Sequence, residues 1–304
     1  MTKVALLERL SDLREQRVPF VLATVIRAES PTSAKPGDSA VILADGTIEG
    51  FVGGSCAEAS VRVESLKALV ANSPTTLVIS PGDDNSSYVP RAGETSVENP
   101  CLSGGTLEIF LEPEIPEPRL VILGHAPIAQ ALYRMAPLAG FDVQWYEDLD
   151  EFPSDTEAVV LASHGSDEEP ALRDALDSGV RYLALVASRK RGTAVLDSLQ
   201  LDQETRARVR TPAGLEIGAR TPAEVALAIL AEIVATRPVE PKLETGREEG
   251  EVTSRASVAV DPVCGMKVAV SQASLQTLHE GVAYFFCGTG CKAAFTDNPK
   301  SYTT

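Results

Sequence analysis

Hydrophobic residues in the first third of the chain alternate between helical and extended spacing. Val4, Leu7, Leu10 and Leu13 recur at about one helical turn, which predicts a helix with a single apolar face. Asp45-Gly46 lies between two apolar runs and predicts a tight hairpin. The expected elements are helices at 2–17 and 57–70 and strands at 20–28, 40–43, 47–52, 77–80 and 106–111. This N-terminal domain, 1–114, is therefore predicted to be α+β.

From residue 119 onward, short apolar runs alternate regularly with helix patterns. Such alternation predicts parallel strands joined by helices. Thr221, Pro222 and Glu224 supply a capping box and an N1 proline for the last helix, which is expected to end near Ala235. The other expected elements are strands at 119–123, 141–146, 158–162 and 182–186 and helices at 126–138, 168–177 and 193–199. Residues 118–238 are therefore predicted to form a Rossmann-like parallel-sheet domain.

Three stretches show neither pattern. Residues 81–100 are polar and rich in turn-forming residues, so a long loop is expected there. Residues 112–118 hold three prolines and three glutamates, as in a short linker. Residues 239–258 hold five glutamates and little that is apolar, which predicts a flexible acidic linker. Residues 259–304 then form a small cysteine-containing module, so the chain as a whole is predicted to be α/β with three domains.

Composition limits the classes of function. The chain has 304 residues, is 44% hydrophobic and carries a formal net charge of −16. This acidic balance argues against nucleic-acid and anionic-membrane partners, and no apolar run is long enough to span a bilayer. Its N-terminus shows an amphipathic helix pattern instead of a secretory signal. Five cysteines in such a chain indicate a reducing, cytoplasmic setting and a role in chemistry or metal binding.

Two glycines, Gly53 and Gly54, separate the predicted hairpin from the second predicted helix. Glycine permits tight backbone geometry and close approach of a ligand. Ser55 is expected to be the N-cap, with Glu58 completing a capping box. Cys56 would then lie in the first helical turn, where the helix dipole favours a thiolate and an anion. The alternative is a buried cysteine on an ordinary strand-to-helix turn.

A second cysteine beside a glycine pair follows at Cys101, Gly104 and Gly105. Two such turns in one small domain indicate a common role. We therefore expect Cys56 and Cys101 to face one shared pocket. The alternative is two separate buried thiols.

The Rossmann-like domain has an incomplete dinucleotide fingerprint. Gly124 begins the turn after its first strand, but Ala126 stands where the second glycine would let the backbone approach a pyrophosphate. The fold is therefore better supported than NAD(P) binding. His164 and the run from Ser188 and Arg189 to Arg191 lie at strand ends, where parallel-sheet sites collect. An anionic ligand is expected there, with a solvated basic turn as the alternative.

Cys264, Cys287 and Cys291 in the C-terminal module have metal-like spacing. A metal ion bound by these cysteines would stabilise a module too small to bury much apolar surface. A closed zinc site needs four ligands, and His279 is the residue available to complete one. Three thiolates could equally hold Cu(I). The alternative is an aromatic mini-core with reduced, unmetallated thiols.

Several ordered motifs give a family resemblance. Residues 1–238 resemble the XdhC/CoxI family of molybdenum-hydroxylase accessory proteins, and residues 261–304 resemble a YHS domain. The first resemblance rests on Asp45-Gly46, Gly53 to Glu58, Cys101 with Gly104-Gly105, Ser188 to Arg191, Pro212 to Ala219 and Thr221 to Glu224. The second rests on Asp261 to Met266, Tyr284 to Cys287, Cys291, Asn298-Pro299 and Tyr302.

The family resemblance implies a non-enzymatic carrier. Such a protein would bind molybdenum cofactor, protect its mature form and deliver it to an apo molybdenum hydroxylase of the xanthine or carbon monoxide dehydrogenase type. Cys56 and Cys101 would lie at the cofactor. A cysteine desulfurase and a second copy of the chain are further partners to consider. The rival functions are an NAD(P)-dependent oxidoreductase, for which the sequence shows no proton relay, and a metal sensor acting through the C-terminal module.

Overall fold

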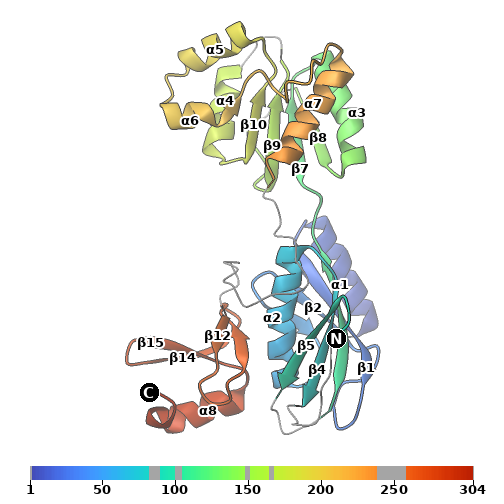
Figure 1. Ribbon diagram of the computed structural model, residues 1–304, viewed down its shortest axis with the longest axis vertical. Helices are drawn as coiled ribbons and strands as arrows, with labels where there is room; N and C mark the ends of the chain where they lie inside the picture. Colours follow the sequence, from blue (N-terminus) through green and yellow to red (C-terminus); the bar gives the residue numbers. More distant parts are fainter. Residues whose placement is uncertain are drawn as a thin grey trace. The chain divides into compact units, whose positions relative to one another are not determined.

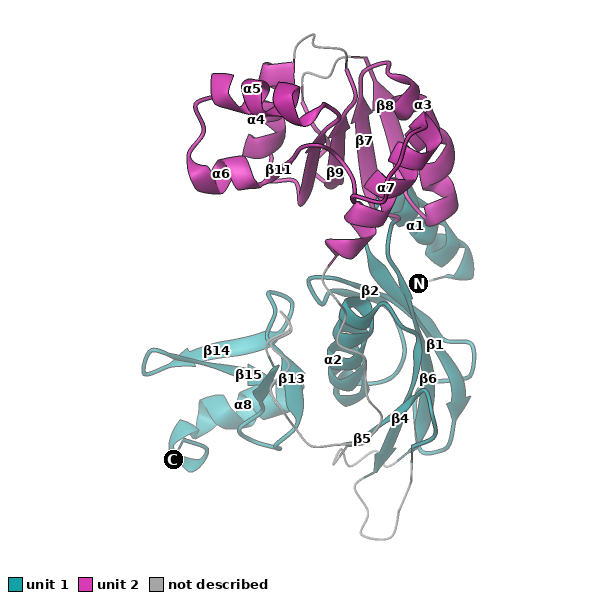
Figure 2. Cartoon of the chain, turned by 45° about the horizontal axis from the view of Figure 1, so that its top comes forward, with its two compact units in different colours: residues 1–116, 243–304 teal, residues 117–242 magenta. Residues whose placement is uncertain are grey.

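The computed structural model describes residues 2–81, 90–99, 105–147, 151–163, 168–237 and 258–303. The chain forms two compact units (Figure 2): residues 1–116 with 243–304, and residues 117–242. The C-terminal module therefore packs with the N-terminal domain, although the whole second unit lies between them in the sequence. None of the described helices is both long and apolar enough to cross a membrane.

The described strands of the N-terminal domain form a six-stranded sheet with two helices (Figure 1). The strand order is β3-β2-β1-β6-β4-β5, and every neighbouring pair is antiparallel except β4–β5. The strands are β1 (Phe20–Ala28), β2 (Ser39–Leu43), β3 (Ile48–Gly50), β4 (Thr75–Pro81), β5 (Glu94–Asn99) and β6 (Leu107–Glu114). The helices are α1 (Lys3–Glu15) and α2 (Ser55–Ala71).

The two helices cover opposite faces of this sheet because side chains alternate along each strand. Phe20 and Val41 pack with Leu13 of α1. Val21 and its neighbours on the other face pack with Val61 of α2. The predicted hairpin and both predicted helices are confirmed.

Two of the irregular stretches contain strand. Part of the predicted 81–100 loop is β5, an edge strand that pairs in parallel with β4. Its polar sequence gave no strand signal because an edge strand needs little burial. The predicted linker at 112–118 is also shorter than expected, since β6 continues to Glu114 and pairs there with Phe20.

The second unit contains a parallel five-stranded sheet in the order β11-β10-β9-β7-β8. Its strands are β7 (Arg119–Leu123), β8 (Asp142–Tyr146), β9 (Thr156–Leu161), β10 (Tyr182–Leu185) and β11 (Val209–Arg210). Its helical segments are α3 (Pro127–Met135), η1 (Ala136–Ala139), α4 (Glu168–Asp177), α5 (Arg189–Ser198), α6 (Gln203–Ala207) and α7 (Pro222–Ala235). One face packs against α3 and α7, and the other against α4 and α5.

This doubly wound arrangement confirms the predicted Rossmann-like sheet. The capping box at Thr221 and Glu224 is also present. Two short elements, α6 and β11, were not predicted because neither carries a full period of apolar residues. Helix α5 begins at Arg189, earlier than the expected 193, because Ser188 is its N-cap.

The C-terminal module contains two short hairpins and a helix. Its elements are β12 (Val258–Val260), β13 (Lys267–Ala269), β14 (Leu275–His279), β15 (Val282–Phe286), α8 (Thr289–Asp297) and η2 (Pro299–Ser301). Phe295 of α8 is 1% exposed and contacts the rings of Tyr284, Phe286 and Tyr302. The aromatic core that the alternative interpretation contained is therefore present.

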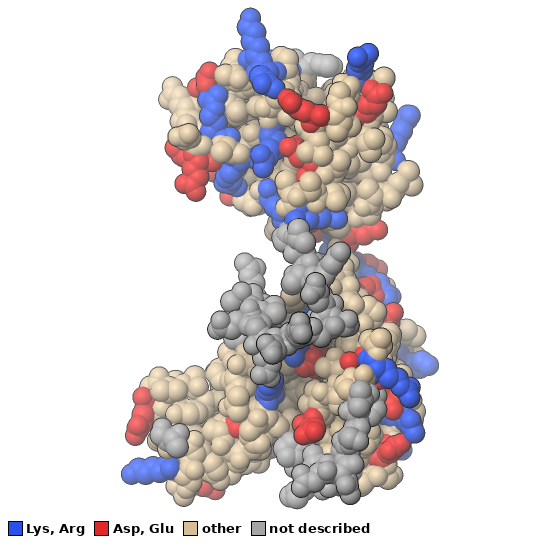
Figure 3. All heavy atoms as spheres, viewed as in Figure 1, with Lys and Arg blue, Asp and Glu red and all other residues tan. Residues whose placement is uncertain are grey.

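The module packs its β13 side against α2. Met266 and Val268 are buried against Ala59 of α2, and Ala269 against Val63 and Leu66. The predicted hairpin turn also touches the module, since a Cβ built on Gly46 would lie 2.9 Å from Ser271 Oγ. On the face drawn in Figure 3 the module carries few charged side chains. Its contact with α2 is made by the apolar side chains of Met266, Val268 and Ala269.

Candidate functional site

The turn before α2 is formed by Gly53 and Gly54. Gly53 has φ +138°, and a Cβ there would lie 2.9 Å from the Cβ of Ala57. Gly54 is the N-cap of α2 and contributes no side-chain hydrogen bond. The expected Ser55 N-cap and its capping box are therefore wrong, because the helix already begins at Ser55. Cys56 nevertheless lies in the first turn, where no side chain caps the backbone amides.

A pocket of about 990 Å³ opens in front of this turn. Five segments line it: the loop at 30–33, the start of α2, the end of β4, the entry to β6, and the start of α8. Its lining residues are Ser30, Pro31, Thr32, Ser33, Gly54, Ser55, Cys56, Ala57, Ile79, Pro81, Gly105, Leu107, Cys287, Gly288, Thr289, Gly290 and Cys291. Two elements far apart in the sequence, α2 and α8, therefore contribute to one pocket.

Gly105 lets two backbone segments of the wall come together. A Cβ built on Gly105 would lie 2.3 Å from the carbonyl oxygen of Pro31 and 2.4 Å from that of Glu29. No side chain fits there. The backbone N–H of Glu29 also donates to the carbonyl of Thr106 at 2.8 Å. Gly105 is therefore needed for close backbone packing at the pocket wall.

Both helices that reach the pocket present N-termini without a side-chain cap. Gly54 begins α2, and Gly288 begins α8. Free amides at a helix N-terminus favour an anion. Within the described residues, the wall includes no Lys, Arg, Asp or Glu. Its polar chemistry comes from amides, hydroxyls and the thiols of Cys56, Cys287 and Cys291.

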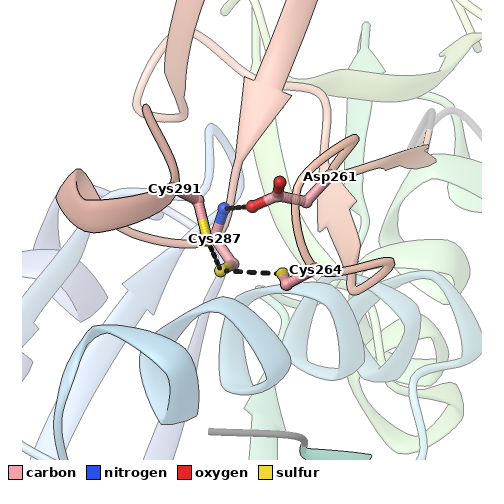
Figure 4. A group of neighbouring side chains, drawn as sticks. All are labelled: Asp261, Cys264, Cys287 and Cys291. Carbon is pink, nitrogen blue, oxygen red and sulfur yellow. Dashed lines mark hydrogen bonds between the residues drawn. The ribbon is translucent and has the colours of Figure 1, made fainter. Parts of the chain in front are cut away.

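The three module cysteines, separated in sequence, lie together (Figure 4), and two of them, Cys287 and Cys291, line the pocket. The sulfur of Cys287 lies 3.5 Å from that of Cys264 and 3.6 Å from that of Cys291. Asp261 is the fourth member of the group, and the four potential ligand atoms all lie within 4.8 Å of one another. The spacing prediction therefore identified three residues that the fold brings together.

Asp261 is fully buried and holds the group in place. Its carboxylate accepts hydrogen bonds from the backbone N–H of Cys287 at 2.8 Å and of Val263 at 2.9 Å. Burial alone would raise the pKa of Asp261, but these hydrogen bonds outweigh it and lower the pKa. Burial raises the pKa of the Cys287 and Cys291 thiols.

His279 is not part of this group. Its ring packs edge-on against Phe295, with 5.9 Å between the ring centroids. The expectation that His279 is the residue to complete the site is therefore wrong, because the fourth residue of the described group is Asp261. The sequence offered a signal for Asp261 in its position three residues before Cys264.

Three of the sequence-predicted site residues, Cys101, Gly104 and His164, lie outside the described residues. The expected pairing of Cys56 with Cys101 falls there too. Gly105 is described and lines the pocket.

In the second unit, Gly124 follows β7, the strand that has β8 on one side and β9 on the other. Its φ is +98°, and a Cβ there would lie 2.7 Å from the carbonyl oxygen of Ala162. Its own carbonyl accepts a hydrogen bond from Trp145 Nε1 at 2.7 Å. Ala126 is the N-cap of α3, and Pro127 removes the first helical amide. This turn therefore offers a pyrophosphate fewer donors than a complete fingerprint would.

The basic run at the start of α5 is largely engaged. Arg189 pairs with exposed Glu216 at 2.8 Å. Arg191 pairs with Glu168, which is 2% exposed and also accepts a hydrogen bond from Ser163 Oγ at 2.7 Å. Ser188 accepts the backbone N–H of Arg191 as a helix cap. These contacts serve the fold, and sequence reasoning missed Glu168 because its partners are distant along the chain.

Fold and site together define a class: an α/β protein with a glycine–cysteine helix turn, a Rossmann-like domain and a cysteine-rich module. Three family models match the chain. They are the XdhC and CoxI family over residues 13–80, the XdhC Rossmann domain over 120–233 and the YHS domain over 259–304. The first two domains therefore belong to the XdhC and CoxI family, and the chain adds a YHS domain to them.

Relatives include two proteins of Escherichia coli (strain K12). Uncharacterized protein YqeB is 31% identical over 260 residues, which cover 75% of this chain and 46% of the relative. Molybdenum cofactor insertion chaperone PaoD is 25% identical over 267 residues, which cover 71% of this chain and 83% of the relative.

A further relative, from Bacillus subtilis (strain 168), is named as a probable xanthine dehydrogenase subunit. It is 25% identical over 159 residues, which cover 43% of this chain and 47% of the relative. The chain thus spans about half the length of YqeB and of the Bacillus subtilis protein. The crystal structure of a xanthine dehydrogenase from Bacillus halodurans is 19% identical, with a TM-score of 0.37, and the match covers 80% of this chain and 98% of that one.

Proposed function

We propose that this protein binds molybdenum cofactor in the pocket at the start of α2 and delivers it to an apo molybdenum hydroxylase. The observation that carries the proposal is the pocket itself. It joins an uncapped helix N-terminus and Cys56 to a space of about 990 Å³. A volume near the upper end of the usual range of about 300–1,000 Å³ suits a cofactor of this size.

The donor set of the pocket fits this cofactor. Molybdenum cofactor combines a pterin, a phosphate or pyrophosphate, and a metal held by sulfur. Backbone amides at the starts of α2 and α8 suit the anionic part. The thiols of Cys56, Cys287 and Cys291 suit the neighbourhood of a soft, sulfur-bound metal. When bound, the cofactor would supply the redox chemistry of its final enzyme and none to this protein.

The chain's own residues would hold the cofactor and exclude water. Ile79 and Leu107 give the wall an apolar side. The described lining residues include no carboxylate or imidazole that could serve as a general base for Cys56. A thiol in such a setting holds a ligand and does not turn over a substrate. The protein is therefore proposed to be a carrier.

Relatives support the client class. PaoD is named as a molybdenum cofactor insertion chaperone, and the Bacillus subtilis relative is named as part of a xanthine dehydrogenase. The proposed client is accordingly a hydroxylase of the xanthine or carbon monoxide dehydrogenase type. A cysteine desulfurase, which would sulfurate the cofactor, is the second proposed partner, and a reducing cytoplasm the proposed setting.

The test is to produce the protein together with the cofactor pathway, denature it and measure the fluorescent oxidised pterin that it releases. Wild-type protein should release pterin and should activate an apo molybdenum hydroxylase when added to it. Cys56→Ser should lower the pterin several-fold. His279→Ala is the control, since His279 does not line the pocket, and it should keep the pterin. Wild-type protein that carries no pterin in repeated preparations would overturn the proposal.

A further inference from the structure

We infer that the cysteine group of the C-terminal module is a Zn²⁺ site that takes its fourth thiolate from the N-terminal domain. The ligands are Cys264, Cys287 and Cys291 of the module and Cys56 of α2. Such a site joins the two domains through one ion and forms part of the pocket wall.

The three module thiols have the spacing of a zinc site. Zinc binds thiolate sulfur at about 2.3 Å with tetrahedral geometry, which separates neighbouring sulfurs by about 3.8 Å. Two of the sulfur pairs here, Cys264–Cys287 and Cys287–Cys291, lie 3.5 and 3.6 Å apart. Small adjustments of side-chain angles would open these contacts to the required distance. Three thiolates in one place also exclude hard oxygen-seeking ions.

Asp261 is a poor candidate for the fourth ligand. One carboxylate oxygen already accepts the N–H of Cys287 and the other that of Val263. Its role is to fix the backbone at Cys287 and so to orient that sulfur. Asp261 is therefore a positioning residue, of the kind that commonly supports metal ligands from behind.

Cys56 approaches the group from the other domain. It packs in the same hydrophobic cluster as Cys264, Cys287 and Cys291, and it lines the same pocket as the last two. Its sulfur lies outside the group of ligand atoms that are within 4.8 Å of one another, so metal binding would require its side chain to turn towards the other three sulfurs. The backbones are close here, since a Cβ built on Gly288 would lie 3.4 Å from the Cβ of Ser55. Figure 4 shows the Cys264 and Cys287 sulfurs on the side of the group that faces α2. Asp261 lies on the opposite side, farther from that helix.

The position of Cys56 also suits a ligand. The first turn of a helix favours the thiolate over the thiol. Binding of Zn²⁺ replaces the proton of each of the four thiols, and those protons pass to solvent. The ion would then tie the start of α2 to the start of α8, on either side of the pocket.

Cobalt(II) titration of the full chain tests this inference. The protein should be made without the pterin pathway, so that the result does not depend on cofactor binding. Wild-type protein should show the absorption bands of tetrahedral cobalt. It should also show a sulfur-to-cobalt charge-transfer absorption whose intensity corresponds to four thiolates. Cys56→Ser should lower that absorption by about a quarter, because one thiolate of four is lost. The Zn²⁺ affinity, measured by competition with cobalt, should fall roughly a hundredfold, because one ligand of four supplies about a quarter of the binding free energy.

His279→Ala is the control that should change neither quantity. If Cys56→Ser has the same absorption and affinity as wild type, Cys56 is not a ligand. The same conclusion would follow if wild-type protein bound Cu(I) through only three thiolates. A wild-type protein without charge-transfer absorption would overturn the site. The two proposals remain separable because cobalt binding is measured on protein made without the pterin pathway. Cobalt binding in a protein that never carries pterin would overturn the proposed function alone, and pterin binding by a protein without a cobalt site would overturn this inference alone.

Discussion

The backbone N–H of Cys287 donates a 2.8 Å hydrogen bond to Oδ2 of Asp261, which has no exposed surface. Replacing this carboxylate should therefore disturb the module. We expect Asp261→Ala to lower the free energy of unfolding by about 3 kcal/mol, since hydrogen bonds to a charged acceptor contribute about 1.5–3 kcal/mol each. Chemical denaturation followed by near-ultraviolet circular dichroism measures this loss. Asp261→Asn, which keeps one acceptor oxygen, should lose less, and equal stability of both variants with wild type would contradict the prediction.

Gly105 and Gly54 both line the pocket but differ in the space around them. An added Cβ at Gly105 meets the Pro31 carbonyl oxygen, whereas one at Gly54 meets nothing within 4 Å. We expect Gly105→Ala to lose about 2–3 kcal/mol of stability through forced backbone movement. Gly54→Ala should lose under about 1 kcal/mol, the usual scale of an N-cap change. Thermal denaturation of the pair checks the order, and a Gly105→Ala variant as stable as Gly54→Ala would refute it.

Tyr182 and Glu232 form a buried hydrogen bond in the second unit. Tyr182 OH donates to Glu232 Oε2 at 2.7 Å, and the same oxygen accepts the N–H of Gly214 at 2.9 Å. Burial, aided by Glu232, raises the pKa of Tyr182, so the phenol remains a donor. Tyr182→Phe should cost about 1–2 kcal/mol. Urea denaturation should show a lower midpoint with an unchanged slope, and a midpoint at or above the wild-type value would count against this role.

The capping box of α7 should make stability depend on acid. Hydrogen bonds from the backbone N–H groups of Thr221 and Arg220 lower the pKa of Glu224. Its contribution is thus fully present above the ordinary value of 4.5 and is lost as the pH falls through the lowered pKa.

Melting temperatures measured between pH 3 and 7 test this dependence. Glu224→Ala should melt below wild type at pH 7, and the difference should narrow below about pH 4.5. Glu169→Ala is a suitable control, since Glu169 is also in the first turn of a helix and its described hydrogen bond comes from the Ser198 hydroxyl, 3.2 Å away, and not from a backbone amide. A difference that stays constant with pH would argue against the charged form of Glu224 as the capping group.

Much of the fold followed from local pattern. The strand at Phe20–Ala28 and the helix at Glu168–Asp177 have the predicted bounds, because buried strands and amphipathic helices have strong periods. The strand at Glu94–Asn99 was missed because its pairing with β4, and not its own apolar content, makes it a strand.

The candidate site was only partly visible in sequence. The spacing of Cys264, Cys287 and Cys291 was enough to group them, because a short module leaves few ways to keep its cysteines apart. The approach of Cys56 to that group was not predictable from any local signal. It depends on packing between α2 and β13, which the chain reaches only after the whole second unit.

The Ser55 error shows how local signals can mislead. Ser55 with Glu58 matches a capping box by spacing, yet Gly54 takes the N-cap position. Glycine in that position leaves the first amides open towards the pocket. Helix stability alone favours serine at the N-cap. A ligand site is better served by glycine, which has no side chain to occupy the backbone amides.

The insertion of residues 117–242 into the first unit affects how the chain is made. Helix α2 carries an apolar stripe, with Ala59, Val63 and Leu66, that packs against Met266, Val268 and Ala269 of the C-terminal module. A ribosome completes the entire Rossmann-like unit before that cover exists. The nascent protein therefore exposes this hydrophobic surface to water while the second unit and the segment after it are translated. The exposure ends when the C-terminal module folds onto α2.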